Sequence, residues 1–173
     1  MLMVECLPLA EDTNRHLDDI AVGRTIRKRR STGMSDDLKK EALAHLSRYS
    51  SVMLATVDAE GPHVRPVTLI EFDNAYWIET GTTSSKVRQI RDNPKVELCL
   101  VFTDDTNSGY ICLAGRAEIV TDGAIRKSVS SHTEFFADYW SGPDDPSFTL
   151  LRVVPASVEY MRPGEMEPHK FAF

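Results

Sequence analysis

Residues 51–102 read SVMLATVDAEGPHVRPVTLIEFDNAYWIETGTTSSKVRQIRDNPKVELCLVF, and this stretch decides the fold. An apolar run rich in strand-forming residues is followed by DAEG, where Gly61 can adopt a positive φ in a turn. A second strand-like run comes next, so the pattern predicts a β-hairpin. Asp73 and Asn74 supply another tight turn before AYWIET, whose aromatic and β-branched residues suit a strand.

A short helix and further strands are predicted after this hairpin. Thr83 or Ser84 can cap a helix that ends before Pro94, because the residue before a proline disfavours helical backbone. KVELCLVF then alternates apolar and polar residues, and YICLAGRAEIV is another strand-like segment. Asp122 can cap an amphipathic helix that reaches about Trp140, and FTLLRVVPASVEYM has the pattern of one or two closing strands.

Another helix is predicted upstream, over residues 36–49. Ser35 is a good N-cap residue, and the two carboxylates after it favour the positive end of the helix dipole. Apolar residues recur at helical spacing: Leu38, Ala42, Leu46 and Tyr49. The order of helices and strands has no regular βαβ alternation, which points to an α+β fold with a closed antiparallel sheet and away from a Rossmann fold.

Residues 1–33 differ from the rest because they lack sustained periodicity. They end in a basic segment in which five of the seven residues from Arg24 to Arg30 are Arg or Lys. We expect an N-terminal arm over 1–33 and a single domain over 34–173. The net charge of −6 makes nucleic acid an unlikely partner for the whole molecule, although a contact through the arm is an alternative.

The cysteines and the apolar runs limit the class of protein and its cellular compartment. Cys6, Cys99 and Cys112 are odd in number and far apart, which favours neither a disulfide framework nor a paired-cysteine zinc site. No apolar run approaches the ~20 residues needed to cross a bilayer, and the N-terminus lacks the basic start of a secretory signal. We expect a soluble cytoplasmic protein, and the isolated histidines predict no metal site.

Two segments of the central stretch suggest a site for an anion. Arg65 is followed by Pro66 inside a strand, which implies a sheet edge, a bulge or backbone that faces a ligand. Hydroxyl residues and a glycine then run from Thr80 to Ser85 and lead into Lys86 at a helix start. Free backbone N–H groups, hydroxyls and a lysine at a helix N-terminus suit a phosphate, although an ordinary capped helix can carry the same residues.

The order of these motifs resembles the pyridoxamine 5'-phosphate oxidase-like family of FMN-binding proteins, in particular its general stress protein type. The shared features are an Ala-Thr strand, a Gly turn, an Arg-Pro-Val strand, an aromatic strand ending in Thr, Ser-Lys at a helix start, and Asn-Pro-x-Val. GRAEIV and DPSFTLLRVVPASVEYM extend the resemblance, which covers about residues 36–162. It implies a six-stranded antiparallel split β-barrel with peripheral helices, and a homodimer with FMN at the subunit interface.

The resemblance implies six cofactor-binding positions: Arg65, Pro66, Val67, Thr80, Ser85 and Lys86. The two cations and Ser85 would hold the FMN phosphate, and Thr80 would contact the phosphate or the ribityl chain. The backbone around Pro66 and Val67 would face the isoalloxazine ring.

The implied function is that of a flavin-dependent oxidoreductase, in which the cofactor supplies the redox chemistry and no catalytic side chain is assigned. The alternatives are a flavin-binding or stress protein without turnover, and the same fold used for a deazaflavin or haem. The C-terminal sequence MRPGEMEPHKFAF lacks the arginine- and tryptophan-bearing segment that grips the substrate phosphate in true pyridoxamine 5'-phosphate oxidases. Oxidation of vitamin B6 is therefore not expected, and His169 in this tail is expected to be a solvated residue rather than a haem ligand.

Overall fold

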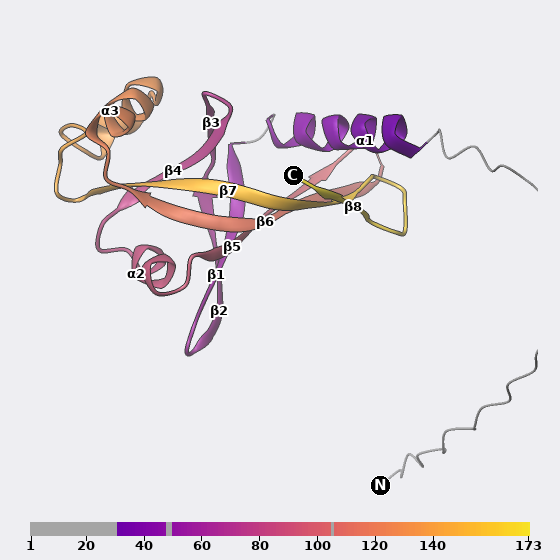
Figure 1. Cartoon of the computed structure of the whole chain (residues 1–173), viewed down its shortest axis with the longest axis horizontal. Helices are drawn as coiled ribbons and strands as arrows, with labels where there is room; N and C mark the ends of the chain where they lie inside the picture. Colours follow the sequence, from indigo (N-terminus) through magenta and orange to yellow (C-terminus); the bar gives the residue numbers. More distant parts are fainter. Residues whose placement is uncertain (1–30, 48–49, 105) are drawn as a thin grey trace, which may run out of the picture.

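The computed structural model describes residues 31–47, 50–104 and 106–173, which form one sheet and three helices (Figure 1). The strands are β1 (Ser51–Asp58), β2 (Gly61–Thr68), β3 (Ile70–Phe72), β4 (Ala75–Gly81), β5 (Lys95–Thr103), β6 (Ser108–Val120), β7 (Phe148–Met161) and β8 (His169–Ala172). The helices are α1 (Ser31–Leu46), α2 (Ser85–Asp92) and α3 (Gly123–His132). Within these ranges, no helix has the length and apolar character to span a membrane. The basic segment of the predicted arm lies outside the described residues.

The sheet has the order β2-β1-β5-β6-β7-β4-β3, with β8 paired to β7, and every pair is antiparallel. Its long central strands β6 and β7 curve across the molecule and carry the other strands on either side (Figure 1). The predicted α+β class and antiparallel split-barrel architecture are thereby confirmed. The predicted number of six strands is wrong, because the sheet has eight.

One of the two additional strands is β3, which a break at Leu69 separates from β2. The backbone N–H of Leu69 donates to the carbonyl oxygen of Ser50 (2.6 Å), and at this point the chain leaves the β1 ladder. The run after Gly61 is therefore divided, so that β2 pairs with β1 whereas β3 pairs with β4. The turn between β3 and β4 is the predicted one, with φ of 52° at Asp73 and 53° at Asn74.

The other additional strand is the C-terminal strand β8. It has four residues and alternates between half-buried and exposed side chains, which is too short and too polar a pattern to predict a strand. The predicted solvated residue His169 lies within it, half-buried, with Nε2 2.6 Å from a carboxylate oxygen of Glu165.

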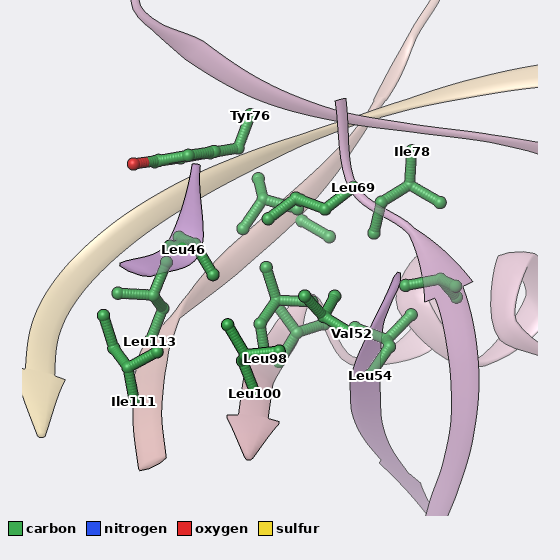
Figure 2. Close-up of a cluster of buried hydrophobic side chains, with 14 of the residues drawn as sticks. Leu46, Val52, Leu54, Leu69, Tyr76, Ile78, Leu98, Leu100, Ile111 and Leu113 are labelled. Carbon is green, nitrogen blue, oxygen red and sulfur yellow. The ribbon is translucent and has the colours of Figure 1, made fainter. Parts of the chain in front are cut away.

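The larger hydrophobic core lies on one face of the sheet and is drawn in Figure 2. Leu98 and Leu100 of β5 lie beside Val52 and Leu54 of β1, all of them nearly inaccessible to water. The alternation of KVELCLVF is confirmed, because its apolar residues at every second position are buried: Val96, Leu98, Leu100 and Phe102.

Helix α1 adds Ala42 and Leu46 to this core. It begins at Ser31, so the prediction of an N-cap at Ser35 is wrong, and Ser35 lies inside the helix. Packing of the later turns on the sheet can carry a helix through residues of low propensity such as Gly33.

Helix α3 begins as predicted but is shorter. The Asp122 carboxylate accepts hydrogen bonds from the backbone N–H groups of Ala124 (2.8 Å) and Ile125 (3.0 Å). The helix ends at His132 rather than Trp140, because Thr133 adopts extended backbone with φ −98° and ψ 114°. A separate short 3₁₀ turn follows and buries Phe136 in a second, smaller core against β4 and β7.

The register between β6 and β7 shifts at Ala114 and Gly115. A Cβ atom at Gly115 would lie 2.2 Å from the carbonyl oxygen of Val154, which is backbone and cannot move aside without distorting β7. We expect Gly115→Ala to lower the free energy of unfolding by about 1–3 kcal/mol, as overpacking does. Gly123→Ala is the matched control, because a Cβ there meets nothing within 4 Å. Equal urea midpoints for the two variants would contradict the close approach.

Candidate functional site

Three of the six predicted cofactor-binding residues come together where β2, β4 and α2 meet. Lys86, in the first turn of α2, donates from Nζ to Oγ1 of Thr80 on β4 (2.7 Å). Arg65 lies on β2, and its charge is near enough to lower the pKa of the Lys86 ammonium. The structure thus brings Arg65, Thr80 and Lys86, which are up to 21 positions apart, to one place.

The other three predicted residues flank this group. Ser85 precedes Lys86 and has an exposed side chain. Pro66 is exposed on the opposite face of β2 from Arg65, and Val67 is buried in the core. Of the three alternatives that Pro66 left open, the structure shows a sheet edge, because β2 ends the strand order.

Both cations are partly buried, which is costly for a charged group. Burial is the main cause that lowers the pKa of Lys86, and the neighbouring Arg65 lowers it further. Burial also lowers the pKa of Arg65, partly offset by the charge of Asp58. Two like charges held close together out of bulk water repel each other, and a bound anion would relieve this repulsion.

The N-terminus of α2 adds hydrogen-bond donors at the same place. Ser84 is the N-cap residue, as one of the two predicted candidates, but its hydroxyl makes no cap hydrogen bond. It lies instead 3.4 Å from Oγ1 of Thr80. The backbone N–H of Val87 donates to the carbonyl oxygen of Ser84 (3.1 Å), so the N–H groups that the start of α2 offers to an anion beside Lys86 are those of Ser85 and Lys86.

Three further polar residues at this site were not predicted. The Arg65 guanidinium donates from Nη1 to Oγ1 of Thr56 (2.6 Å) and from Nη2 to Oε1 of Gln89 (2.8 Å). Gln89 in turn donates from Nε2 to Oδ2 of Asp58 (2.9 Å). The sequence could have indicated Gln89, because it follows Lys86 by three residues and helical spacing places both residues on one face of α2.

Comparison with known proteins gives matches over most of the chain. The family described as pyridoxamine 5'-phosphate oxidase matches residues 38–162, which include the whole site. The chain belongs to the pyridoxamine 5'-phosphate oxidase family. Among its relatives is general stress protein 26 of Bacillus subtilis (strain 168), which is 28% identical over 134 residues, or 76% of this chain and 94% of that protein.

Several solved structures share the fold. General stress protein 26 from Bacillus anthracis superposes with a TM-score of 0.63 at 20% identity, over 79% of this chain and 98% of that one. A FAD-binding protein from Mesorhizobium loti superposes with a TM-score of 0.61 at 18% identity, over 73% of this chain and 94% of that one. A haem-binding protein from Mycobacterium smegmatis superposes with a TM-score of 0.63 at 20% identity, over 76% of this chain and 56% of that one. At these identities the likeness establishes the fold and not the ligand.

Inorganic phosphate should stabilise the protein through the two cations. A ligand that binds only the folded state at ten times its dissociation constant adds about 1.4 kcal/mol to the free energy of unfolding. We expect the melting temperature to rise with phosphate for the wild-type chain and much less for Lys86→Met. Lys127→Met, at an exposed lysine on α3, is the control and should behave as the wild type does. Thermal unfolding at constant ionic strength measures this, and an equal rise in all three proteins would refute an anion site here.

Proposed function

We propose that this family member is an FMN-binding flavoprotein, in which Arg65 and Lys86 hold the phosphate of the cofactor. The observation that carries the proposal is the convergence of these two cations at a partly buried place beside Thr80 and the start of α2. A terminal phosphate carries up to two negative charges, which matches two cations, and it accepts hydrogen bonds from hydroxyls and helix N–H groups.

The edge strand β2 suits the flavin ring. On an edge strand, one row of backbone N–H and C=O groups has no neighbouring strand to bond. The polar edge of an isoalloxazine ring can bond such a row near Pro66 and Val67, in line with the roles that the family resemblance implies. Ser85 would add its hydroxyl to the phosphate from the helix start.

A second copy of the chain would cover the ring. The outer face of β2, β1 and β5 carries exposed apolar side chains at positions that lie across from one another, such as Met53 opposite Pro66, with the half-buried Cys99 on the other side of Met53. Val64 is 62% exposed and Val101 is 68% exposed on this face. Exposed apolar patches of this kind are typical of protein interfaces. We therefore propose a homodimer with FMN at the subunit boundary.

The activity that fits best is that of a flavin-dependent oxidoreductase. When bound, FMN supplies the redox chemistry, and the residues at the site bind and orient it. The alternative is a flavin-binding protein without turnover. Reduction of the bound flavin by NADH or NADPH, followed by reoxidation with an added acceptor, separates the two. The absorption spectrum of the purified protein separates FMN from a deazaflavin or from haem, which the Mycobacterium smegmatis protein of this fold binds.

Loss of either cation should weaken FMN binding far more than riboflavin binding. Each charge-assisted contact to a phosphate contributes about 1.5–3 kcal/mol, so Arg65→Ala or Lys86→Ala should raise the FMN dissociation constant about tenfold to over a hundredfold. Riboflavin lacks the phosphate and should bind the variants as it binds the wild type. Titration of flavin fluorescence measures both. Unchanged FMN affinity, or parallel losses for the two flavins, would place the phosphate elsewhere.

The dimer should separate when charge is placed on the outer face of β5. Light scattering should give twice the chain mass of 19.4 kDa for the wild type. Val101→Lys should shift the protein toward the single-chain mass, because a symmetric interface over this face would take one ammonium group from each chain out of water. Ile125→Lys, at a 40% exposed apolar residue on α3, should stay dimeric. A wild-type monomer that binds FMN tightly would argue against a shared site.

A further inference from the structure

Gln89 is a buried polar residue in the middle of the cation site, with 2% of its surface exposed. Its Oε1 accepts hydrogen bonds from Thr56 Oγ1 (2.7 Å) and Arg65 Nη2 (2.8 Å), and its Nε2 donates to Asp58 Oδ2 (2.9 Å). A guanidinium can only donate and an ionised carboxylate can only accept. The amide therefore has one satisfactory orientation, with its oxygen toward Arg65 and its nitrogen toward Asp58.

Asp58 is a permanent anion close to this cation site. A hydrogen bond from His63, followed by that from Gln89, lowers its pKa to about 2. Its charge acts on Arg65, whose pKa it raises. The two residues nonetheless make no direct ion pair, because the amide of Gln89 lies between them and contacts both.

We propose that Gln89 is a neutral spacer that keeps Arg65 from pairing with Asp58 and so leaves the guanidinium oriented toward a phosphate. The proposal rests on the phosphate site proposed above. Within the described part of the chain, Arg65 donates three hydrogen bonds from its five N–H groups. The acceptors are Oγ1 of Thr56, the carbonyl oxygen of Leu54 (3.4 Å) and Oε1 of Gln89. Two donors remain for a ligand. Gln89 is a positioning residue, because it acts through Arg65.

Without the spacer, Arg65 would turn to the nearest anion, which is Asp58. The ion pair would neutralise one of the two positive charges and take the remaining donors away from the phosphate. A glutamate at position 89 would have the same effect, because it would place a carboxylate directly on the guanidinium. The neutral amide is thus the group that both satisfies Arg65 and preserves its charge.

The test compares FMN and riboflavin affinity in Gln89→Met, which keeps the length of the side chain and removes its three polar contacts, to Thr56, Arg65 and Asp58. FMN affinity should fall about tenfold, the loss of roughly one charge-assisted contact, while riboflavin affinity stays within about twofold. Gln89→Glu is the second variant. It should lose FMN affinity at least as strongly, because its carboxylate pairs with Arg65.

Removal of Asp58 supplies the decisive control. Asp58→Asn alone should bind FMN at least as tightly as the wild type does, because it removes a negative charge beside the two cations. Gln89→Met combined with Asp58→Asn should recover most of the lost affinity, since no carboxylate remains to capture Arg65. A purely structural role for Gln89 predicts no such recovery. Wild-type FMN affinity in Gln89→Met, equal losses for both flavins, or no recovery in the double variant would overturn the inference. A wild-type chain that binds FMN no better than riboflavin would overturn the phosphate site itself, and this inference with it.

Discussion

Repulsion between Arg65 and Lys86 is the constraint on which the account of this site depends. Folding places both cations in partly buried positions, where water screens their charges poorly. Among the residues that the structure describes, the groups that accept their hydrogen bonds are neutral. The nearest carboxylate, Asp58, is engaged by His63 and by the amide of Gln89. The positive charge of the site is thus kept rather than neutralised, which is what an anion-binding site requires.

The topology of the sheet explains how these residues meet. β2 stands at one end of the strand order and β4 lies near the other, but the curvature of the sheet brings β2 and β4 into contact. The break at Leu69 is essential to this arrangement, because it sends the chain from the β1 ladder directly to the partner strand of β4. Helix α2 follows β4 closely, so that Lys86 reaches Thr80 on β4 and Gln89 reaches Arg65 on β2.

Local patterns in the sequence were sufficient for much of the fold and for part of the site. Alternation predicted β5, the Asp73-Asn74 turn was recognisable from residue type alone, and Lys86 stood out at a helix start. The split at Leu69 and the early start of α1 depend on tertiary contacts that no local pattern encodes. Gln89 was missed because a glutamine in a polar helix segment is ordinarily solvated, and only the fold buries it beside Arg65.

A crystal structure of the protein with bound FMN would locate the phosphate. Its oxygens should lie within hydrogen-bond distance, about 2.7–2.9 Å, of both the Arg65 guanidinium and Nζ of Lys86, with Gln89 still between Arg65 and Asp58. A phosphate bound elsewhere, with Arg65 held only by Thr56 and Gln89 and Lys86 only by Thr80, would contradict the account.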